Sequence, residues 1–290
     1  MLVRALSVFL SLGLSGVAVP CSIFMAVNEE TVLAGNNEDY YLDVTPLVWV
    51  EPGTGAEHGR LCWGFEEDKP RDFAQGGLNQ KGLFFDAAVT PESGTKRIKG
   101  KKKAPDNMGD ALLTECATVA EALAWLEQWD LQLINNGHLL LADATGDGAV
   151  VELHEGAMKL FRREQGNYVA ATNFRFSNPG AGNFPCPRFE SVRQYFKEAQ
   201  GAVTPDAFRE LLKSISVPRT RDESTKRDGG TLYSNVCDLR SGTVVFYRER
   251  DFDSPIVLSL MEELAKGRRK VTMWDLPGPV AKQELRLPSR

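Results

Sequence analysis

The sequence predicts a layered α+β protein with a single domain, and three observations support this prediction. The chain has 290 residues, of which 42% are hydrophobic, and this is enough for one sizeable core. Many short apolar runs rich in β-forming residues are separated by turn signals such as Arg240-Ser-Gly242. The helical patterns are few and stand apart from these runs, which favours antiparallel hairpins layered with helices. No linker, repeat or low-complexity tract divides residues 21–290, so we expect one domain there.

Residues 1–20 have the pattern of a leader that is removed from the mature protein. A short positively charged start is followed by an apolar run that ends at Val19. The run is shorter than the roughly 20 apolar residues that a membrane-spanning helix needs. A buried N-terminal helix is the alternative, although Gly13, Gly16 and Pro20 would weaken it. We therefore expect a secreted or periplasmic protein without a membrane span.

Cys21 follows the predicted leader and begins a strand-like run. The small residues Gly16 and Ala18 suit a signal peptidase, whose cut would leave Val19 and Pro20 in front of the cysteine. A lipid anchor on Cys21 is the rival interpretation, but lipidation prefers a small residue before the cysteine and a polar tether after it. Here an apolar run follows at once. A cysteine at the start of a core strand would be held rigidly, as a nucleophile must be.

The remaining elements can be placed from periodicity and capping signals. Thr118 and Glu121 form a capping box that opens a helix over 120–129, and Thr204-Pro205-Asp206 opens a helix whose apolar stripe runs from Phe208 to Ile215. A further helix is expected after Pro187. The expected strands are, in order, Ser22–Val27, Thr31–Ala34, Leu47–Val50, Gly82–Ala88, His138–Ala142, Ala149–Leu153, Lys159–Arg162, Tyr168–Thr172, Thr231–Asp238 and Thr243–Tyr247.

Charge and composition exclude several classes of function. The net charge of −5 and the pI near 5.4 argue against a nucleic acid or an anionic membrane surface as the partner. The three histidines form no H-x-x-x-H motif, and we expect neither a metal site nor a cofactor. Five cysteines in an exported protein suggest one thiol with a separate task, and Cys21 is the natural candidate. The other four could form up to two disulfides or stay reduced: Cys62, Cys116, Cys186 and Cys237.

Several motifs, taken in order, resemble the N-terminal nucleophile (Ntn) hydrolases of the choloylglycine hydrolase, penicillin acylase and isopenicillin-N acyltransferase-like type. Those proteins begin with an exposed cysteine and continue through a hairpin that ends in G-R-N-x-D. The matching segments, from Cys21 to about residue 251, are Cys21-Ser-Ile-Phe, Gly35-Asn-Asn-Glu-Asp39, Asn79-Gln-Lys-Gly-Leu83, Gly148-Ala-Val-Val-Glu152, Ala171-Thr-Asn173, Pro187-Arg-Phe189 and Gly230-Thr-Leu-Tyr-Ser234.

The resemblance implies a four-layer αββα sandwich, with two antiparallel sheets between helix layers, and an amidase that acts on linear, non-peptide C–N bonds. Cys21 would be the nucleophile, and its own α-amino group, once free, would be the base. The resemblance further implies that Asp39 orients the α-ammonium group, Asn173 donates to the oxyanion and Arg188 lies beside the nucleophile. The expected partner is a small N-acyl amide substrate, and a homo-oligomer is possible. Asp39, Asn173 and Arg188 could each instead be a turn or surface residue, and Asn79 is expected to shape a hairpin.

Two positions depart from the pattern of the relatives. Asn36 stands where the family has an arginine that would favour a thiolate, and Val89 stands where many relatives have a second oxyanion or substrate residue. The basic segment 96–103 follows, and it could attract an anionic substrate or simply be a solvated loop. Bile-salt and penicillin specificity are therefore not claimed.

Three functions remain in competition on the sequence. The first is an exported cysteine amidase, with an acyltransferase of the same fold as its close variant. The second is a binding protein that is lipid-anchored through Cys21. The third is a secreted β-rich scaffold without catalytic activity.

Overall fold

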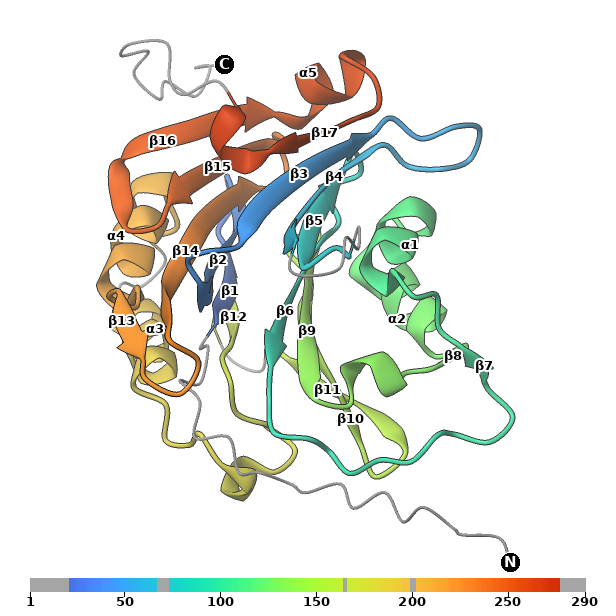
Figure 1. Cartoon of the computed structure of the whole chain (residues 1–290). Helices are drawn as coiled ribbons and strands as arrows, with labels where there is room; N and C mark the ends of the chain where they lie inside the picture. The colour runs from blue at the N-terminus through green and yellow to red at the C-terminus, as the bar shows by residue number, and fades with distance from the viewer. Residues whose placement is uncertain (1–20, 67–72, 164–165, 199–201, 277–290) are drawn as a thin grey trace, which may run out of the picture.

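Two antiparallel sheets, of seven and eight strands in the described part of the chain, form the body of the molecule (Figure 1). The structure is a computed structural model and describes residues 21–66, 73–163, 166–198 and 202–276. The first sheet has the order β12-β1-β2-β14-β15-β16, with β13 also paired to β14. Its strands are β1 (Ser22–Val27), β2 (Val32–Tyr41), β12 (Tyr168–Ala171), β13 (Thr220–Asp222), β14 (Arg227–Asp238), β15 (Thr243–Arg248) and β16 (Asp251–Ser259).

The second sheet has the order β11-β10-β9-β6-β5-β4-β3-β17. Its strands are β3 (Thr45–Glu51), β4 (Arg60–Glu66), β5 (Gly76–Asn79), β6 (Phe84–Val89), β9 (Gly137–Ala142), β10 (Gly148–His154), β11 (Ala157–Arg162) and β17 (Arg269–Thr272). A short parallel pair, β7 (Lys102–Lys103) with β8 (Trp129–Asp130), lies apart from both sheets.

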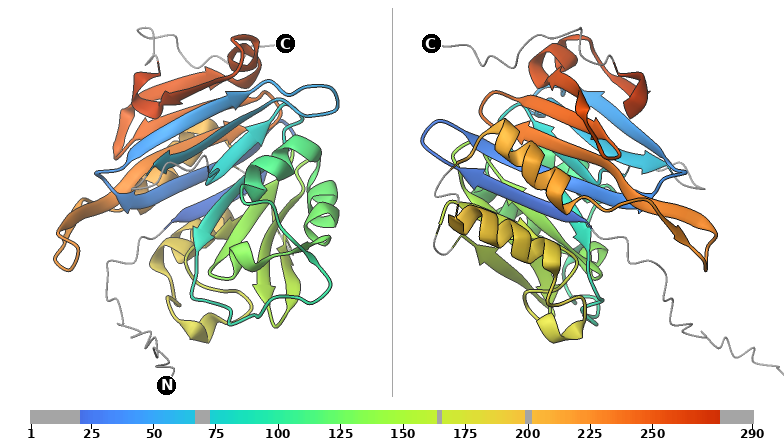
Figure 2. Two further views of the ribbon diagram at one scale, coloured as in Figure 1. Left: turned by 45° about the vertical axis from the view of Figure 1, so that its right-hand side comes forward. Right: turned by 90° about the vertical axis from the view of Figure 1, so that its left-hand side faces the viewer.

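Helices cover the outer face of each sheet and complete four layers. The helices α1 (Met108–Glu115) and α2 (Val119–Leu126) cover the second sheet, whereas α3 (Pro187–Glu198) and α4 (Pro205–Ile215) cover the first (Figures 1 and 2). A fifth helix, α5 (Leu260–Ala265), follows β16. The predicted αββα sandwich is confirmed.

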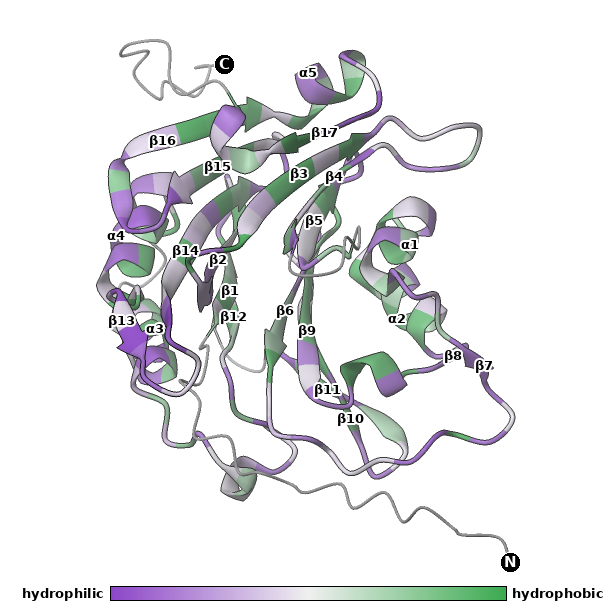
Figure 3. Ribbon diagram, in the orientation of Figure 1, coloured by the Kyte–Doolittle hydropathy of each residue, from purple (hydrophilic) through white to green (hydrophobic). Residues whose placement is uncertain are grey.

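Alternation along the strands produces three apolar layers between the four structural layers. Ile23 and Met25 point into the core between the sheets, and Phe24 points toward α3 and α4. Figure 3 shows the hydrophobic residues concentrated along the strands and on the sheet-facing sides of the helices. Burying alternate side chains on both faces fixes the register, because a slip of one residue would exchange the faces. This fixed register positions the first residue of β1.

Several elements differ from the sequence prediction. Strand β2 continues through polar residues to Tyr41 instead of ending at Ala34, because β1 and β14 bond it on both sides. The helix expected over 120–129 ends at Leu126, and Trp129 lies in β8. Strands β4, β5, β16 and β17 and helices α1 and α5 were not predicted.

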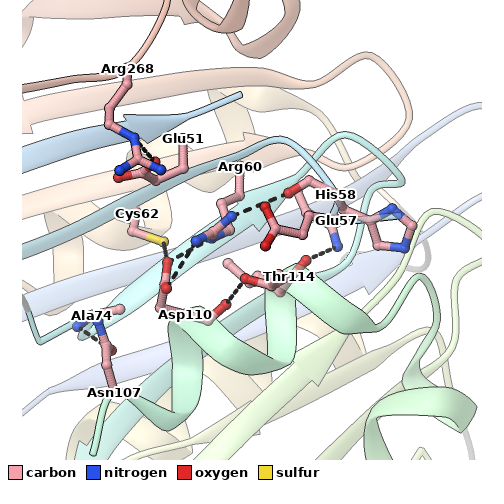
Figure 4. Close-up of polar contacts among 12 residues, drawn as sticks. Glu51, Glu57, His58, Arg60, Cys62, Ala74, Asn107, Asp110, Thr114 and Arg268 are labelled. Carbon is pink, nitrogen blue, oxygen red and sulfur yellow. Dashed lines mark hydrogen bonds and ion pairs between the residues drawn. The ribbon is translucent and has the colours of Figure 1, made fainter. Parts of the chain in front are cut away.

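An ion pair fastens α1 to the second sheet (Figure 4). The guanidinium group of Arg60 on β4 donates two hydrogen bonds to the carboxylate of Asp110 on α1, at 2.6 and 3.0 Å. The thiol of Cys62 also points to Asp110, at 3.6 Å. Such a two-point arginine–carboxylate contact fixes direction as well as distance. The start of α1 is thereby held over β4, β5 and β6.

The described residues also bear on other sequence-based expectations. All five cysteines are buried and free, so the option of disulfides is not realised. Within the described ranges there is no group of three metal-ligating side chains and no helix long and apolar enough to cross a bilayer. The predicted leader, residues 1–20, lies outside the described residues.

Candidate active site

Cys21 directly precedes β1, the strand that lies between β12 and β2 in the first sheet. Its side chain belongs to the same face as Ile23 and Met25, so the sulfur points into the space between the two sheets. Only 4% of the residue is exposed. Burial and the charges of Glu38 and Asp39 raise the pKa of the thiol well above its usual range, while a backbone hydrogen bond from Asp39 lowers it. A free thiolate is thus disfavoured unless a base takes the proton during the attack.

A cavity of about 240 Å³ opens beside the sulfur. Most of its wall is apolar and comes from β6, β9, α1 and the segments next to them. The lining residues are Cys21, Glu38, Phe73, Ala74, Gln75, Phe85, Ala87, Ala88, Val89, Met108, Gly109, Leu133, Ile134, Asn136, Gly137, His138 and Leu139. A mainly apolar pocket with a few polar groups at one end is typical of a small-molecule site.

Glu38 is the acidic group nearest to the sulfur among the described residues that line this cavity. The Cys21 thiol donates to its Oε1 atom at 3.8 Å. Burial raises the pKa of Glu38 to about 7, and hydrogen bonds from Asn36 and Cys21 lower it. The Asn36 amide also donates to Asp86 on β6, at 3.1 Å, and so connects the two carboxyl groups. Burial raises the pKa of Asp86 well above its usual range as well, and the charge of Glu38 adds to this.

Asp39 points to the opposite face of β2, toward the helices. Its Oδ1 atom accepts a hydrogen bond from the hydroxyl group of Thr231 on β14, at 2.5 Å. Its Oδ2 atom is buried and has no hydrogen-bond partner among the described residues. Burial raises the pKa of Asp39 well above its usual range, whereas the Thr231 hydrogen bond and the charge of Arg188 lower it. Asp39 therefore has one carboxyl oxygen, Oδ2, that none of the described residues contacts by a hydrogen bond.

Arg188, in the first turn of α3, connects two of the other predicted residues, Cys21 and Asn173. Its Nη1 atom donates to the main-chain oxygen of Cys21 and to the hydroxyl group of Ser22, each at 2.6 Å. Its Nη2 atom donates to Oδ1 of Asn173 at 2.9 Å. The guanidinium group suits this task because its donors lie in one rigid plane. The helix-facing side of the site is thus built around one cation.

Asn173 follows β12 and is 5% exposed. Its side-chain Nδ2 atom donates to the main-chain oxygen of Val89 at 2.8 Å, and Asn183 donates to its main-chain oxygen at 2.9 Å. An amide nitrogen carries two hydrogens, so the second hydrogen of Nδ2 is left for a ligand. The structure therefore groups Cys21, Asp39, Asn173 and Arg188 at one end of the first sheet.

Of the other residues singled out from the sequence, Asn79 and the segment 96–103 lie outside the cavity lining, whereas Val89 belongs to it. The Asn79 side chain donates to the main-chain oxygens of Leu113 and Cys116, at 2.8 and 2.7 Å, so it joins the β5–β6 turn to α1. None of residues 96–103 lines the cavity, and most of their side chains are exposed. Val89 lines the cavity, and its main-chain oxygen holds Asn173.

Sequence reasoning did not single out Glu38 and Asp86. Strand alternation would have indicated Glu38. It stands between Asn37 and Asp39, and neighbouring side chains in a strand point to opposite faces, so Glu38 faces away from the side that Asp39 faces. That argument required β2 to extend beyond Ala34, which the polar composition of 36–39 concealed. Nothing in the sequence near Asp86 indicated that β6 would bring it to Asn36.

Solved structures of hydrolases share this architecture. Two structures of conjugated bile acid hydrolase from Clostridium perfringens, a mutant and a variant, align at a TM-score of 0.67 with 16% and 15% identity, and each alignment covers 87% of this chain and 96% of the other. Penicillin V acylase from Agrobacterium tumefaciens aligns at a TM-score of 0.60 with 20% identity, over 79% of this chain and 83% of the other.

No family model matches the sequence. No curated protein matches it either. The likeness therefore lies in the three-dimensional arrangement, and it covers most of both chains. The chain has the sandwich fold of the Ntn hydrolases, as the sequence motifs indicated.

Proposed function

We propose that this protein is an amide hydrolase that cleaves a linear, non-peptide C–N bond of an N-acylated small molecule, with Cys21 as the nucleophile. The observation that carries the proposal is the position of Cys21. Its sulfur lies at one end of a mainly apolar cavity, and Arg188 holds its main chain from the other side. The neighbours in fold, a conjugated bile acid hydrolase and a penicillin V acylase, support the reaction class.

The chemistry begins when the peptide bond before Cys21 is cut. The freed α-amino group has an ordinary pKa near 7.7–8.0, so it can take the thiol proton at working pH. The sulfur then attacks the amide carbonyl carbon and forms a tetrahedral oxyanion. As the C–N bond breaks, the α-ammonium group returns the proton to the leaving nitrogen, and an acyl thioester of Cys21 remains. Water then attacks the thioester, so the carboxylic acid leaves and the thiol is restored.

Asp39 and Arg188 have complementary tasks in this scheme. Asp39 accepts a hydrogen bond from the α-ammonium group while that group is charged, and its Oδ2 atom, which has no partner among the described residues, supports this role. Arg188 donates to the carbonyl of Cys21, and its charge offsets part of the rise that burial causes in the pKa of Asp39. Together they position the base relative to the sulfur.

Asn173 is proposed to donate its remaining amide hydrogen to the oxyanion. Its orientation is fixed twice, since Arg188 donates to its oxygen and Val89 accepts from its nitrogen. A donor held in place before the reaction begins can stabilise the developing charge without reorganising.

Export and processing belong to the same proposal. We propose that residues 1–20 direct the chain to the exterior or the periplasm and are then lost. Val19 and Pro20 could be removed by a peptidase that cuts after proline, or by attack of the Cys21 thiol on the Pro20 carbonyl. The burial of Cys21 and the apolar strand that follows it support a nucleophile more than a lipid anchor.

The test uses protein purified from an exporting host. Intact mass and N-terminal sequencing should show Cys21 as an unmodified first residue. A panel of N-acyl amides should give thioester-linked acyl groups on Cys21 by mass spectrometry, and Cys21→Ser should give no thioester. Added amines would divert the acyl group if transfer competes with hydrolysis. Full activity with Val19 or a lipid still on the nitrogen of Cys21 would refute the proposed base.

A further inference from the structure

The cavity beside Cys21 has an acidic end that the proposed reaction does not use. Glu38 lines the cavity, and its Oε1 atom lies 3.8 Å from the sulfur. A carbonyl carbon bonded to that sulfur would place its own α-carbon within reach of the same carboxyl group. The rest of the acyl group would lie along the apolar wall. Glu38 is therefore positioned to contact a substituent next to the scissile bond.

Glu38 is one of two buried carboxyl groups joined by an amide. The Nδ2 atom of Asn36 donates to Glu38 at 3.5 Å and to Asp86 at 3.1 Å. Trp63 donates to Asp86 from the second sheet, at 3.3 Å. All of these contacts are with uncharged donors. A buried carboxylate without a counter-charge is costly, and burial therefore favours the protonated form of each group. A ligand that brings a positive charge would instead stabilise the ionised form of Glu38.

The described lining of the cavity contains no lysine or arginine. Its histidine, His138, is paired with Glu152 at 3.1 Å and not with Glu38. Arg188 lowers the pKa of Asp39 on the other face of β2, but the groups that lower the pKa of Glu38 are Asn36 and Cys21. The two faces of β2 therefore differ in charge. The face that carries Asp39 has Arg188 as a cation nearby, whereas the face that carries Glu38 has the carboxyl group of Asp86 nearby and no cation among the described lining residues.

Unsatisfied polar atoms lie in the same region. The hydroxyl group of Tyr233 and the Oδ1 atom of Asn36 are buried without a hydrogen-bond partner among the described residues. Tyr233 pairs with Glu38 in the register of β14 and β2. The charges of Glu38, Asp86 and Cys21 all act on the Tyr233 hydroxyl. Buried polar groups without partners are rare in native proteins, and each calls for an explanation such as a water molecule or an ion. Asn36 and Tyr233 lie behind Glu38, which is the member of this group that lines the cavity.

We propose that Glu38 determines substrate specificity and selects an apolar acyl group with a protonated amine on the carbon next to the scissile carbonyl. The proposal rests on the amidase function above and names its substrate class. The ammonium group would donate to Glu38, and the apolar remainder would pack against Phe85, Met108 and Leu139. An acyl group with a carboxylate at the same position would be rejected, because two buried negative charges would meet.

The first experiment compares four acyl groups that share a six-carbon chain and differ only in the substituent on carbon 2: hexanoyl, 2-hydroxyhexanoyl, 2-aminohexanoyl and 2-carboxyhexanoyl. Each is presented on p-nitroaniline and on benzylamine, so that one unsuitable leaving group does not decide the result. At pH 7, most of an α-amine with a pKa near 7.7–8.0 is protonated. Because a hydrogen bond to a charged group contributes measurably, kcat/KM for the 2-amino substrate should exceed that for hexanoyl at least tenfold. The 2-carboxy substrate should be the poorest.

Glu38→Gln keeps the shape and the hydrogen bond to Asn36 but removes the charge. In this variant the preference for the 2-amino group should fall below twofold, whatever happens to the overall rate. Gln75→Met is the matched control, because Gln75 lines the same cavity and should alter all four substrates alike. A wild-type enzyme that cleaves hexanoyl without preferring the 2-amino group would overturn the inference and leave the amidase proposal standing. If Glu38→Gln kept the full preference for the 2-amino substrate, the inference would also be overturned and the amidase proposal would also remain.

A second measurement does not depend on catalysis. Cys21 is alkylated with iodoacetamide in the presence of 2-aminohexanamide or hexanamide, and the concentration that halves the rate is compared. The 2-amino compound should protect at a concentration at least tenfold lower in the wild type, and the difference should vanish in Glu38→Gln. Protection without amide cleavage would refute the amidase proposal alone. Equal protection by both compounds would refute the role of Glu38.

Discussion

Arg188 donates a hydrogen bond from its Nη1 atom to the main-chain oxygen of Cys21, at 2.6 Å. This contact ties the first turn of α3 to the first residue of β1, although 167 positions separate them in the sequence. Cys21 is therefore fixed through its backbone, and its sulfur remains directed toward the cavity. Changes in α3 should reach the reaction through this contact.

Replacing Arg188 should impair both stability and activity. A lysine has a point charge and cannot reproduce the planar contacts with Cys21, Ser22 and Asn173, so Arg188→Lys should lower kcat/KM roughly 10- to 100-fold. Arg188→Met should be worse, because it also leaves the Asp39 carboxylate without its cation. Arg193→Lys, an exposed position on the same helix, is the control and should change the free energy of unfolding by less than about 0.5 kcal/mol. Equal effects at the two positions would contradict the assignment.

Two substitutions at Asn173 separate positioning from oxyanion stabilisation. Asn173→Ala removes the donor, and kcat should fall by roughly 10²–10³ if the amide serves the oxyanion. Asn173→Asp keeps the acceptor for Arg188 but lacks the donor. If Asn173 donates to the oxyanion, the aspartate variant should be as poor as the alanine variant. Recovery of activity in Asn173→Asp would show that holding Arg188 is the whole role.

Alkylation should distinguish Cys21 from the other thiols. We expect iodoacetamide to label Cys21 fastest at neutral pH once its α-amino group is free, because that group can accept the thiol proton. In the chain with residues 1–20 attached, burial and nearby carboxylates keep the thiol pKa high, so labelling should be slower. Cys186 lines a second cavity with Asn173 and Arg188 and is the main competitor. Peptide mapping of the wild type and of Cys186→Ser measures both rates, and faster labelling of another thiol would count against the nucleophile.

Glu38 should make the free energy of unfolding depend on pH. Its pKa is about 7 in the folded protein and near 4.5 when unfolded, so the folded state binds the proton more tightly. Its contribution is greatest below about pH 4.5 and is lost as the pH rises through 7. The unfolding free energy of the wild type relative to Glu38→Gln should thus fall by about 2.5 kcal/mol from pH 5 to pH 8. Urea titrations at both pH values measure this, with exposed Glu30→Gln as the control.

Gly109 on α1 should not tolerate a side chain. A Cβ atom there would lie 2.1 Å from the ring carbon Cζ of Phe85, and both residues line the cavity. Gly109→Ala should cost about 1–3 kcal/mol of unfolding free energy through overpacking and should reduce the affinity for bulky acyl groups. Gly180→Ala is the control, since its nearest neighbour would be 3.8 Å away. A fully stable Gly109→Ala protein would show that Phe85 can move aside.

The layered fold was predictable because apolar runs and turn residues reveal strands directly. Strand β1 has the predicted bounds, and the helix from Pro205 to Ile215 follows its capping signals. The end of β2 was not predictable in the same way. Asn37 bonds to Leu212 in α4 and to Ser234 in β14, so tertiary contacts keep a polar segment in the sheet.

The candidate site was partly predictable for a related reason. The prediction of Cys21 depends on its position after the predicted leader, and the predictions of Asp39, Asn173 and Arg188 depend on the order of the motifs. The contact between Arg188 and the main chain of Cys21 involves residues far apart in sequence, and no local pattern encodes it. The same holds for Asp86, which meets Asn36 only because β6 and β2 lie in facing sheets.

Glu38 and Asp39 are neighbours in the chain, yet their carboxyl groups face opposite layers of the molecule. If the two residues have the proposed roles, residue 38 can be exchanged to suit a new acyl group while residue 39 continues to contact the α-amino group. Inserting or deleting a single residue within this strand would have the opposite effect. It would turn the carboxyl group of Asp39 toward the sulfur and that of Glu38 away from it. Both the proposed substrate binding and the proposed proton transfer would then be lost.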